Sequence, residues 1–317
     1  MSQQVSTAHV KMFSANVMHL AQQKESRLYE FCRHESFVGE SKFFDRIGLL
    51  AAQDKAGRHS KVAYSDTPHS RRKVSMLDKY VADLVDDEDK IRTIQNLDNE
   101  YAQAISAALA REMDQIIIDS ALGNAYTGKE GTVAVALPNS QKLCAFDGVS
   151  VTGSGLNVET LRAVKKKFRQ AEAVGKNEQL IFVCAAQQID DLLGNTEVTS
   201  ADFNTVKALA QGDVDTFMGF KFIQTELLPF TSAATTYTPA TGEVDGGAGG
   251  TVALGEGRRC FAFTSKRCLI AAMGAPKNVR ITEMPEYHYA HQIYGKFSMG
   301  AVRMEEVQLQ EVICKEL

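Results

Sequence analysis

A helical pattern without glycine or proline places the strongest constraint on the fold. It runs from Asp86 to Leu122, and apolar side chains recur along it at the spacing of one helix face. Acidic residues at its start suit the positive end of a helix dipole, and Gly123 predicts a left-handed stop. At 1.5 Å per residue such a helix would be roughly 50 Å long, so we expect it to act as a spine. Its apolar face consists of Ile91, Ile94, Leu97, Tyr101, Ile105, Leu109, Met113 and Ile116.

The composition is that of an ordinary soluble globular protein. The 317 residues are 44% hydrophobic and 23% charged, with a formal net charge of -4, and they allow one large domain or two modest ones without disulfides. The pI of about 6.0 argues against a protein whose main task is to neutralise phosphates. Weak or local contacts with nucleic acid stay open.

Apolar runs and cysteines indicate the compartment. The longest apolar runs, 180–186 and 268–273, are far shorter than the roughly 20 residues that cross a bilayer, and 1–20 lacks the apolar core of a secretory signal. We therefore expect no membrane span and a chain that stays in the cytoplasm where it is made. No two cysteines are closely spaced, which argues against a zinc ribbon or redox motif and predicts reduced, mostly buried thiols. They stand at positions 32, 144, 184, 260, 268 and 314.

Two segments near the amino terminus cannot fold alone, the first because it is too short and the second because it is too poor in apolar residues. Thr7 and an apolar stripe from Val10 to Leu20 predict a short amphipathic helix that docks on its own core or on a neighbouring chain. The region 39–80 combines glycine and proline with many polar residues, so we expect an extended hairpin or long loop that projects from the body. Its basic region contains Arg58, His59, Lys61, Arg71, Arg72 and Lys73.

The rest of the chain predicts alternating helices and strands, with no internal repeat. Together with the long helix, this pattern indicates an α+β fold. The expected elements are a small β element over 132–137 and 141–146, a helix, buried strand and short helix within 157–194, a helix over 199–209, a strand over 219–223, an exposed loop over 231–250, and mostly β structure over 260–317.

A glycine-rich motif matches a phosphate-binding loop only in part. Residues 123–129 follow the pattern GxxxxGK, but Glu130 replaces the serine or threonine that would hold magnesium. The motif also follows the end of a helix, whereas a true loop follows a strand and opens a helix. A helix end and a turn are the better interpretation.

The other candidate sites favour structural roles. His288 and His291 would point to opposite faces of a strand and have no third ligand, so we expect structural or surface histidines. The acidic run 86–89 lacks the glycine and final glutamate of a calcium loop, which favours helix capping. No GxSxG elbow or nucleophile context is present. We expect no catalytic, cofactor-binding or metal-binding residues.

Two basic clusters have more than one interpretation. Lys165, Lys166, Lys167 and Arg169 favour a solvated helix face, with contact to nucleic acid or an acidic neighbour as the alternative. The run 71–73 is opposite in charge to the acidic run 86–89. It could pair with that run on an adjacent subunit and set the register between copies, or it could be simply solvated.

A series of motifs, each weak alone, is specific in its order and spacing. Through these motifs nearly the whole chain resembles major capsid proteins of tailed bacteriophages. They are Gln22–Leu28, Gly39-Glu40, Phe43–Gly48, Pro68–Arg72, the acidic helix start Asp86–Lys90, Arg111 with Asp114, the turn Gly123–Gly128, Gly219–Phe222 and Leu228-Pro229.

The resemblance implies the Hong Kong 97-like capsid fold, which agrees with a docking arm, a projecting segment and a lone long helix. Each extension lacks a core of its own, so its burial must come from other subunits. The implied domains are an N-terminal arm over 1–38, an extended loop over 39–85, a peripheral domain with the spine helix over 86–150, an axial domain over 151–272, and return strands to the peripheral domain over 273–317.

The implied function is assembly, not enzymatic catalysis. Many copies would form pentamers and hexamers of an icosahedral head shell that encloses double-stranded DNA, in a virion assembled in the host cytoplasm. The alternatives are a tail or decoration protein and, less favoured, a nucleotide hydrolase that uses residues 123–129. The expected inter-subunit contacts are Phe43, Phe44, Arg71, Arg72, Lys73, Asp86, Asp87 and Asp89.

The resemblance also implies partners. The chain lacks the long charged amino-terminal extension that acts as a fused scaffold, so a separate scaffolding protein is expected, with a portal protein, a decoration protein and weak contact to packaged DNA. Neither a cofactor nor a membrane is implied. Some relatives join a lysine and an asparagine covalently. Lys55, Lys61 and Lys73 lie in the candidate loop but nothing marks one as reactive, so we predict no cross-link.

Overall fold

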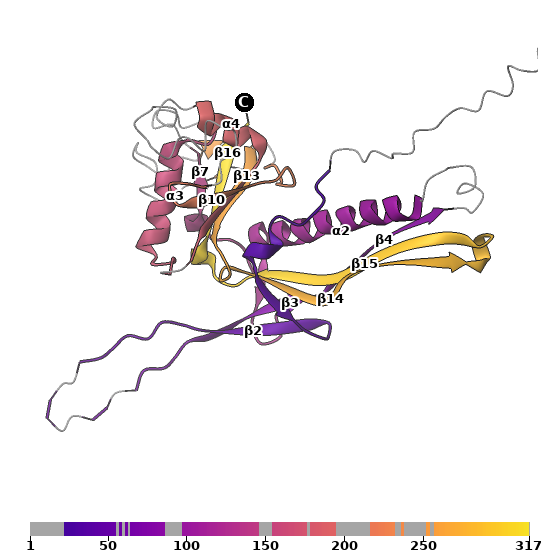
Figure 1. Cartoon of the computed structure of the whole chain (residues 1–317). Coiled ribbons are helices and arrows are strands. Elements are labelled where there is room, and N and C mark those ends of the chain that lie inside the picture. The colour runs from indigo at the N-terminus through magenta and orange to yellow at the C-terminus, as the bar shows by residue number, and fades with distance from the viewer. Residues whose placement is uncertain are drawn as a thin grey trace, which may run out of the picture. The chain divides into compact units, whose positions relative to one another are not determined.

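The computed structural model divides the chain into two compact units (Figure 1). Unit 1 comprises residues 1–26, 77–113 and 275–298, and unit 2 comprises 27–76, 114–274 and 299–317. The structure describes residues 22–54, 57–58, 61–62, 64–85, 97–145, 154–175, 178–194, 216–231, 236–237, 252–253 and 257–316. The predicted helices over 7–20 and 199–209 lie outside these ranges.

A six-stranded sheet forms the larger core of unit 2. The most apolar run of the chain, β8 (Leu180–Cys184), is buried along its whole length at the centre of this sheet, as predicted. It pairs in parallel with β10 (Phe220–Gln224) and antiparallel with β13 (Gly257–Thr264). The strand order is β7 (Lys142–Cys144), β16 (Leu309–Lys315), β13, β8, β10 and β9 (Thr216–Phe217).

Two helices belong to this part of unit 2, and both were predicted. In α3 (Val158–Gln170) the side chain of Asn157 caps the first turn by accepting a 2.8 Å hydrogen bond from the Thr160 amide. Its buried residues include Leu161, Val164 and Phe168, which recur at helical spacing. The shorter α4 (Ala186–Gly194) follows β8 and precedes the parallel strand β10.

A second sheet of unit 2 carries the projecting segment. The hairpin of β2 (Ser41–Ile47) and β3 (His69–Ser75) pairs through β3 with β5 (Ala125–Thr127), which pairs with β6 (Val133–Val135). Figure 1 shows the chain between β2 and β3 running far out from this sheet, which confirms the predicted extension.

One sheet prediction was wrong. The strands near 132–137 and 141–146 exist, but they do not form one β element. The first is β6, which pairs with β5, and the second is β7, which pairs in parallel with β16 in the larger sheet. The short 3₁₀ turn Asn139–Gln141 separates them. Three residues are too few to show a clear alternation of apolar and polar side chains, so the sheet that such a strand joins depends on the strands available to pair with it.

The long helix α2 (Leu97–Leu122) has 26 residues, which correspond to about 39 Å. Residues 97–113 belong to unit 1 and the rest to unit 2. The helix ends before Gly123 as predicted, but this glycine is not left-handed. A side chain at Gly123 would instead lie 2.5 Å from the Asp119 carbonyl oxygen, so the close return of the backbone requires glycine. The predicted start at Asp86 lies outside the described residues.

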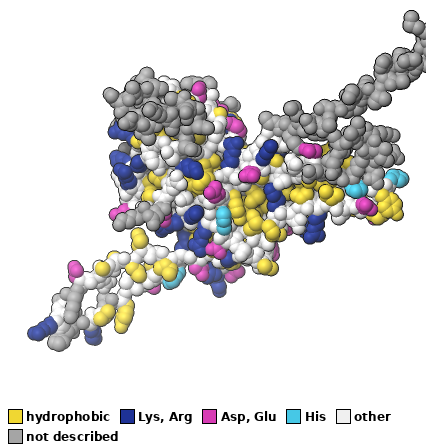
Figure 2. Space-filling view, viewed as in Figure 1, with side chains coloured by type: hydrophobic (Ala, Val, Ile, Leu, Met, Phe, Trp, Pro, Cys, Tyr) yellow, Lys and Arg dark blue, Asp and Glu magenta, His cyan; other side chains and the backbone are white. Residues whose placement is uncertain are grey.

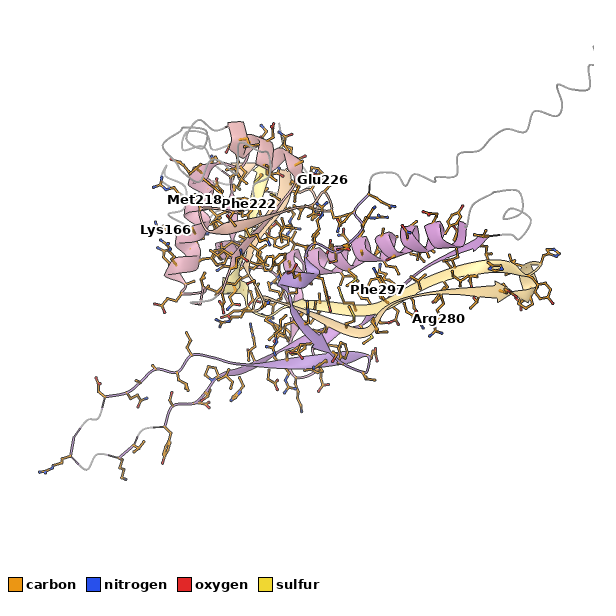
Figure 3. All side chains as sticks on the ribbon, in the orientation of Figure 1. Lys166, Met218, Phe222, Glu226, Arg280 and Phe297 are labelled. Atoms are coloured by element: carbon orange, nitrogen blue, oxygen red, sulfur yellow. The ribbon has the colours of Figure 1, made fainter. Side chains whose placement is uncertain are left out.

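In unit 1 the helix packs on long strands. Here β15 (Ala290–Arg303) lies between β14 (Leu269–Met284) and β4 (Leu77–Val85). Figure 3 shows Phe297 on the helix side of these strands and Arg280 on the other side. A side chain at Gly295 would meet Ile105 at 2.5 Å, so this position lets the helix approach closely. The 3₁₀ turn Pro285–Tyr287 connects β14 to β15.

The remaining elements agree with the mostly β carboxyl-terminal region. In unit 2, β1 (Arg33–Ser36) pairs in parallel with the first residues of β14, and the 3₁₀ turn Glu306–Gln308 precedes β16. The predicted loop 231–250 is described only in part. There a short strand, β11 (Thr236–Tyr237), pairs antiparallel with β12 (Val252–Ala253), so 236–237 is not a free loop.

Two motifs that carried the resemblance contact each other. The Asp114 carboxylate, fully buried, accepts hydrogen bonds of 3.0 and 3.2 Å from the Arg27 and Leu28 amides in unit 2. The 3₁₀ turn Tyr29–Phe31 follows. In unit 1 Arg111 donates to the Gln22 side chain at 2.8 Å. The segment before the first strand is therefore fastened to α2 by polar contacts.

We predict that Asp114→Ala destabilises the chain and frees this segment. The substitution leaves two backbone amides without their charged acceptor, which costs roughly 2–4 kcal/mol. Asp114→Asn is the matched control, because it keeps one oxygen acceptor and should lose about half as much. Urea unfolding and the rate of trypsin cleavage after Arg27 measure both effects. Equal cleavage rates in the wild type and Asp114→Ala would show that the contact does not fasten the segment.

Candidate subunit interfaces

Side chains alternate along β2 and β3, and this alternation separates the expected contact residues. Arg72 lies opposite Phe44 and points inward, whereas Arg71 lies opposite Asp45 on the other face. Phe44 packs against a buried apolar cluster of unit 2. The run 71–73 is therefore not one basic patch, because its middle residue belongs to the interior.

Arg72 is engaged within its own chain. Its side chain is 2% exposed and pairs with the Glu306 carboxylate, and its Nε also lies 3.5 Å from the Met304 carbonyl oxygen. Burial lowers the pKa of the Arg72 guanidinium, and Glu306 acts in the opposite direction. Arg72 therefore anchors the extension at its base.

Two further arginines converge on the same carboxylate. Arg46 Nη1 lies 3.6 Å from Glu306 Oε2, and Arg303 Nε lies 3.9 Å from Glu306 Oε1. Arg303 is fully buried, and burial lowers the pKa of its guanidinium. Three guanidinium groups thus share the Glu306 carboxylate, and because two of them are buried the fit of each side chain is energetically important.

Arg303 also satisfies the carboxyl-terminal end of α2. It donates to the carbonyl oxygens of Ala121 at 2.6 Å and Gly123 at 3.0 Å. Arg259 on β13 donates to the Leu122 carbonyl at 3.3 Å. The last carbonyls of a helix have no partner within it and carry the negative end of its dipole, so two guanidinium groups stabilise this end.

The opposite side of the small sheet combines exposed and half-buried side chains, and we call it the outer face. Arg71 Nε lies 3.1 Å from Asp45 Oδ1, and its guanidinium lies 5.6 Å from the Phe43 ring. Lys73 lies opposite both Phe43 and Tyr126. Apolar and cationic groups thus alternate on one surface. The outer face consists of Phe43, Asp45, Ile47, Arg71, Lys73 and Tyr126.

Beyond the outer face, the extension carries apolar side chains without cover. Leu49 is 99% exposed and Tyr64 is 93% exposed, and Leu50 and Val62 are also exposed. Gly48 donates a 2.8 Å backbone hydrogen bond to Pro68, which closes the last rung before the two chain segments separate. Figure 2 shows hydrophobic side chains along this extension. Several exposed large apolar side chains on one projection are typical of an interaction site.

The remaining predicted contacts cannot all be placed. Asp86, Asp87 and Asp89 lie outside the described residues, so their pairing with the basic run stays a prediction. Lys61 lies on the extension and is exposed, and Lys55 is among the residues that the structure leaves undescribed.

The partial phosphate-loop motif forms a hairpin. Residues 125–127 are β5 and turn through Gly128, with φ of 96°, into β6. The chain runs from a helix into a strand, which is the reverse of a phosphate-binding loop. The predicted helix end and turn are confirmed, although the strand itself was missed.

The histidine pair has no ligand geometry. His288 is not on a strand, because it lies in left-handed conformation in the turn after Tyr287. His291 lies on β15, with Nε2 3.9 Å from Glu283. Across the described ranges, no three His, Cys, Asp or Glu side chains are arranged to hold a metal ion. Nor does any helix in those ranges have the length and apolarity to cross a membrane.

The cysteines are free, and all except half-buried Cys144 are buried, as predicted. Burial raises the pKa of Cys32 to about 12, with a smaller contribution from Asp114. Burial likewise raises the pKa of Cys144 to about 12. These thiols stay protonated at neutral pH, so they lack the nucleophilic thiolate of a reactive cysteine.

The buried arginines at the base of the extension differ in how far the sequence predicts them. Successive side chains of a strand point to opposite faces, so a strand over 69–75 places Arg72 on the face opposite to Arg71 and Lys73. This alternation is the sequence signal for Arg72. Arg303 and Glu306 had no such signal, because Arg303 contacts residues about 180 positions earlier in the chain.

Comparisons with known proteins agree with this architecture. A family model described as phage capsid protein matches residues 5–316. No curated protein sequence matches the chain. Among solved structures, the capsid of cyanophage P-SCSP1u has a TM-score of 0.70 at 15% identity, over 99% of this chain and 95% of that one. The capsid of Ralstonia phage GP4 has a TM-score of 0.71 at 12% identity, over 98% and 96%.

A third match is the head structure of Helicobacter pylori bacteriophage KHP40, with a TM-score of 0.69 at 10% identity, over 99% of this chain and 98% of that one. Likeness at such low identity shows the fold. It confirms the predicted α+β, Hong Kong 97-like capsid fold.

The alternation on β3 predicts different effects for adjacent arginines. Arg72→Ala should lower the free energy of unfolding by about 2–3 kcal/mol, because it empties a buried site, whereas Arg71→Ala at the surface should change it by less than about 0.5 kcal/mol. Arg72→Met, which keeps the aliphatic stem, should lose less than Arg72→Ala. Urea unfolding of the unassembled chain measures all three. Equal losses for Arg71→Ala and Arg72→Ala would contradict the assignment of faces.

The buried thiols predict a pH dependence of stability. Since their pKa values are raised in the folded state, their contribution is complete below the unfolded pKa of about 8.5 and is lost as pH rises toward about 12. The free energy of unfolding should therefore fall above about pH 9. Thiol titration at pH 8 should be slow for the folded chain and rapid in denaturant. Rapid reaction of all six cysteines in the folded chain would refute this account.

Proposed function

The chain belongs to the phage capsid protein family and forms the head shell, and we propose that its copies do so as pentamers and hexamers of an icosahedral shell around double-stranded DNA. The family model matches residues 5–316, so membership in the family applies to nearly the whole chain. In a closed symmetric assembly every copy buries the same surface, so contacts that are weak individually add up over the shell.

The uncovered extension is the observation that carries this proposal. Leu49, Leu50, Val62 and Tyr64 lie on a two-segment projection, and within the described ranges no layer of the chain covers them. Full burial of a large apolar side chain contributes about 1.5–3 kcal/mol. Several such side chains per copy would give each subunit a strong tendency to cover the extension with a neighbour.

The outer face supplies a second, charged contact in the proposal. Arg71 and Lys73 would pair with Asp86, Asp87 and Asp89 of an adjacent copy and set the register between them. Phe43 would contribute apolar area beside them. Arg72 and Phe44 are not part of this contact, because both are engaged within their own chain.

Several finer elements belong to the same proposal. We propose that residues 1–38 act as an arm, 39–85 as the extended loop, 86–150 as the peripheral domain, 151–272 as the axial domain and 273–317 as return strands. Assembly would take place in the host cytoplasm with a separate scaffolding protein and a portal protein, and a decoration protein could be added to the shell. The chain would have no enzymatic activity.

Charges placed on the extension should block assembly. We predict that Leu49→Asp combined with Leu50→Asp abolishes closed shells, because burying two carboxylates against a neighbour is strongly unfavourable. The thermal midpoint of the unassembled chain should stay within about 1 °C, since both side chains are exposed in it. Negative-stain electron microscopy, with a scaffolding partner where assembly needs one, and differential scanning fluorimetry measure the two effects.

Gln53→Asp is the matched control. It adds a charge to the same segment but removes no apolar side chain, and it should form shells. Normal shells from the double variant would show that the extension is not a subunit interface. A wild-type chain that forms only tubes or monomers would contradict the proposed function itself.

A further inference from the structure

Three cations form a stripe along the exposed side of α3. Arg162, Lys166 and Arg169 are four and three residues apart, so they lie on one helix face, and all three are exposed. The buried side of the same helix carries Leu161 and Phe168. Figure 2 shows Lys and Arg side chains gathered over this helix, and Figure 3 labels Lys166 on it. We call these three residues the α3 stripe.

The neighbouring lysines of the helix have structural roles, which separates them from the stripe. Lys165 Nζ donates to the Met218 carbonyl at 2.5 Å, and burial lowers its pKa, with a smaller contribution from Arg169. Lys167 Nζ donates to the Ser140 carbonyl at 2.9 Å. Two of the four residues in the basic cluster thus contact backbone carbonyls of their own chain, whereas Arg162, outside that cluster, joins the stripe.

Several carboxylates near the larger sheet are already engaged with arginines, which leaves fewer that could match the stripe on a neighbouring copy. Asp191 on α4 is engaged differently, because it accepts hydrogen bonds from the Gln187 side chain and the Leu156 amide, and Asp190 beside it is exposed. Glu159, in the first turn of α3, is a single acid and does not neutralise three cations. The engaged pairs are Glu178 with Arg267, Glu226 and Glu316 with Arg258, and Glu311 with Arg259.

We infer that the α3 stripe contacts the phosphates of packaged double-stranded DNA, an inference that rests on the proposed shell. From Arg162 to Arg169 the helix rises about 10 Å, and that length of duplex carries about six phosphate charges. Three cations on a chain with a net charge of -4 give a local and salt-sensitive contact. Such a contact holds DNA in place without preventing its release.

The test compares three forms of the full chain: the wild type, a stripe variant and a control variant. The stripe variant is Arg162→Gln/Lys166→Gln/Arg169→Gln. The control variant, Lys277→Gln/Arg280→Gln/Lys296→Gln, removes the same charge from exposed positions of unit 1. Binding of a fluorescent 20-base-pair duplex is measured against NaCl concentration, and assembly is followed by electron microscopy. Each phosphate contact contributes about 0.9 to the slope of log affinity against log salt.

We expect the slope of the stripe variant to be smaller by about 2 to 3, with shells still formed and the control slope unchanged. An unchanged slope in the stripe variant would overturn the inference, as would an equal loss in the control. Loss of assembly by the stripe variant with an unchanged slope would assign the stripe to an acidic neighbouring copy instead. A wild type that binds DNA but never closes shells would contradict the proposed function, and this outcome is distinct from failure of the stripe.

Discussion

Apolar side chains in water must find cover, and on the extension of this chain the part of the subunit that the structure describes offers little. Leu49 and Tyr64 are almost completely exposed, on a projection that is too thin to contain a core. Because apolar burial is non-directional and roughly proportional to area, it can drive assembly but cannot by itself set a unique geometry. The charged and aromatic groups of the outer face, among them Arg71 and Phe43, offer the directional contacts that select one register.

A projection can contribute to a regular shell only if its base is fixed. Here Arg46 on β2 and Arg72 on β3 both reach Glu306, just before β16, and so join the extension to a distant part of unit 2. Buried charges are costly unless each is held by partners, so this site tolerates few alternative arrangements. Arg303 adds the end of α2 to the same site. The orientation of the extension therefore depends on a small number of buried polar contacts.

The sequence predicted those elements whose pattern is local. The stripe of α3 and the continuous apolar run of β8 are clear in the residues themselves, and both formed as predicted. Short strands were less predictable, because β6 and β7 have three residues each and their partners decide their sheet. Gly123 was correctly placed at the helix end, but a close carbonyl, not a left-handed backbone, requires it.

The candidate interface was only partly predictable, because it depends on strand alternation and on contacts between residues far apart in the sequence. A basic run on a projecting segment suggested one patch, yet the period of two along β3 places Arg72 inside and Arg71 outside. The partner Glu306 is separated from Arg72 by 234 residues, so no local pattern could reveal it. Cryo-electron microscopy of assembled shells tests the central claim most directly. The account predicts that Leu49, Leu50 and Tyr64 are buried against another copy, and a closed shell in which they remain in solvent would contradict it.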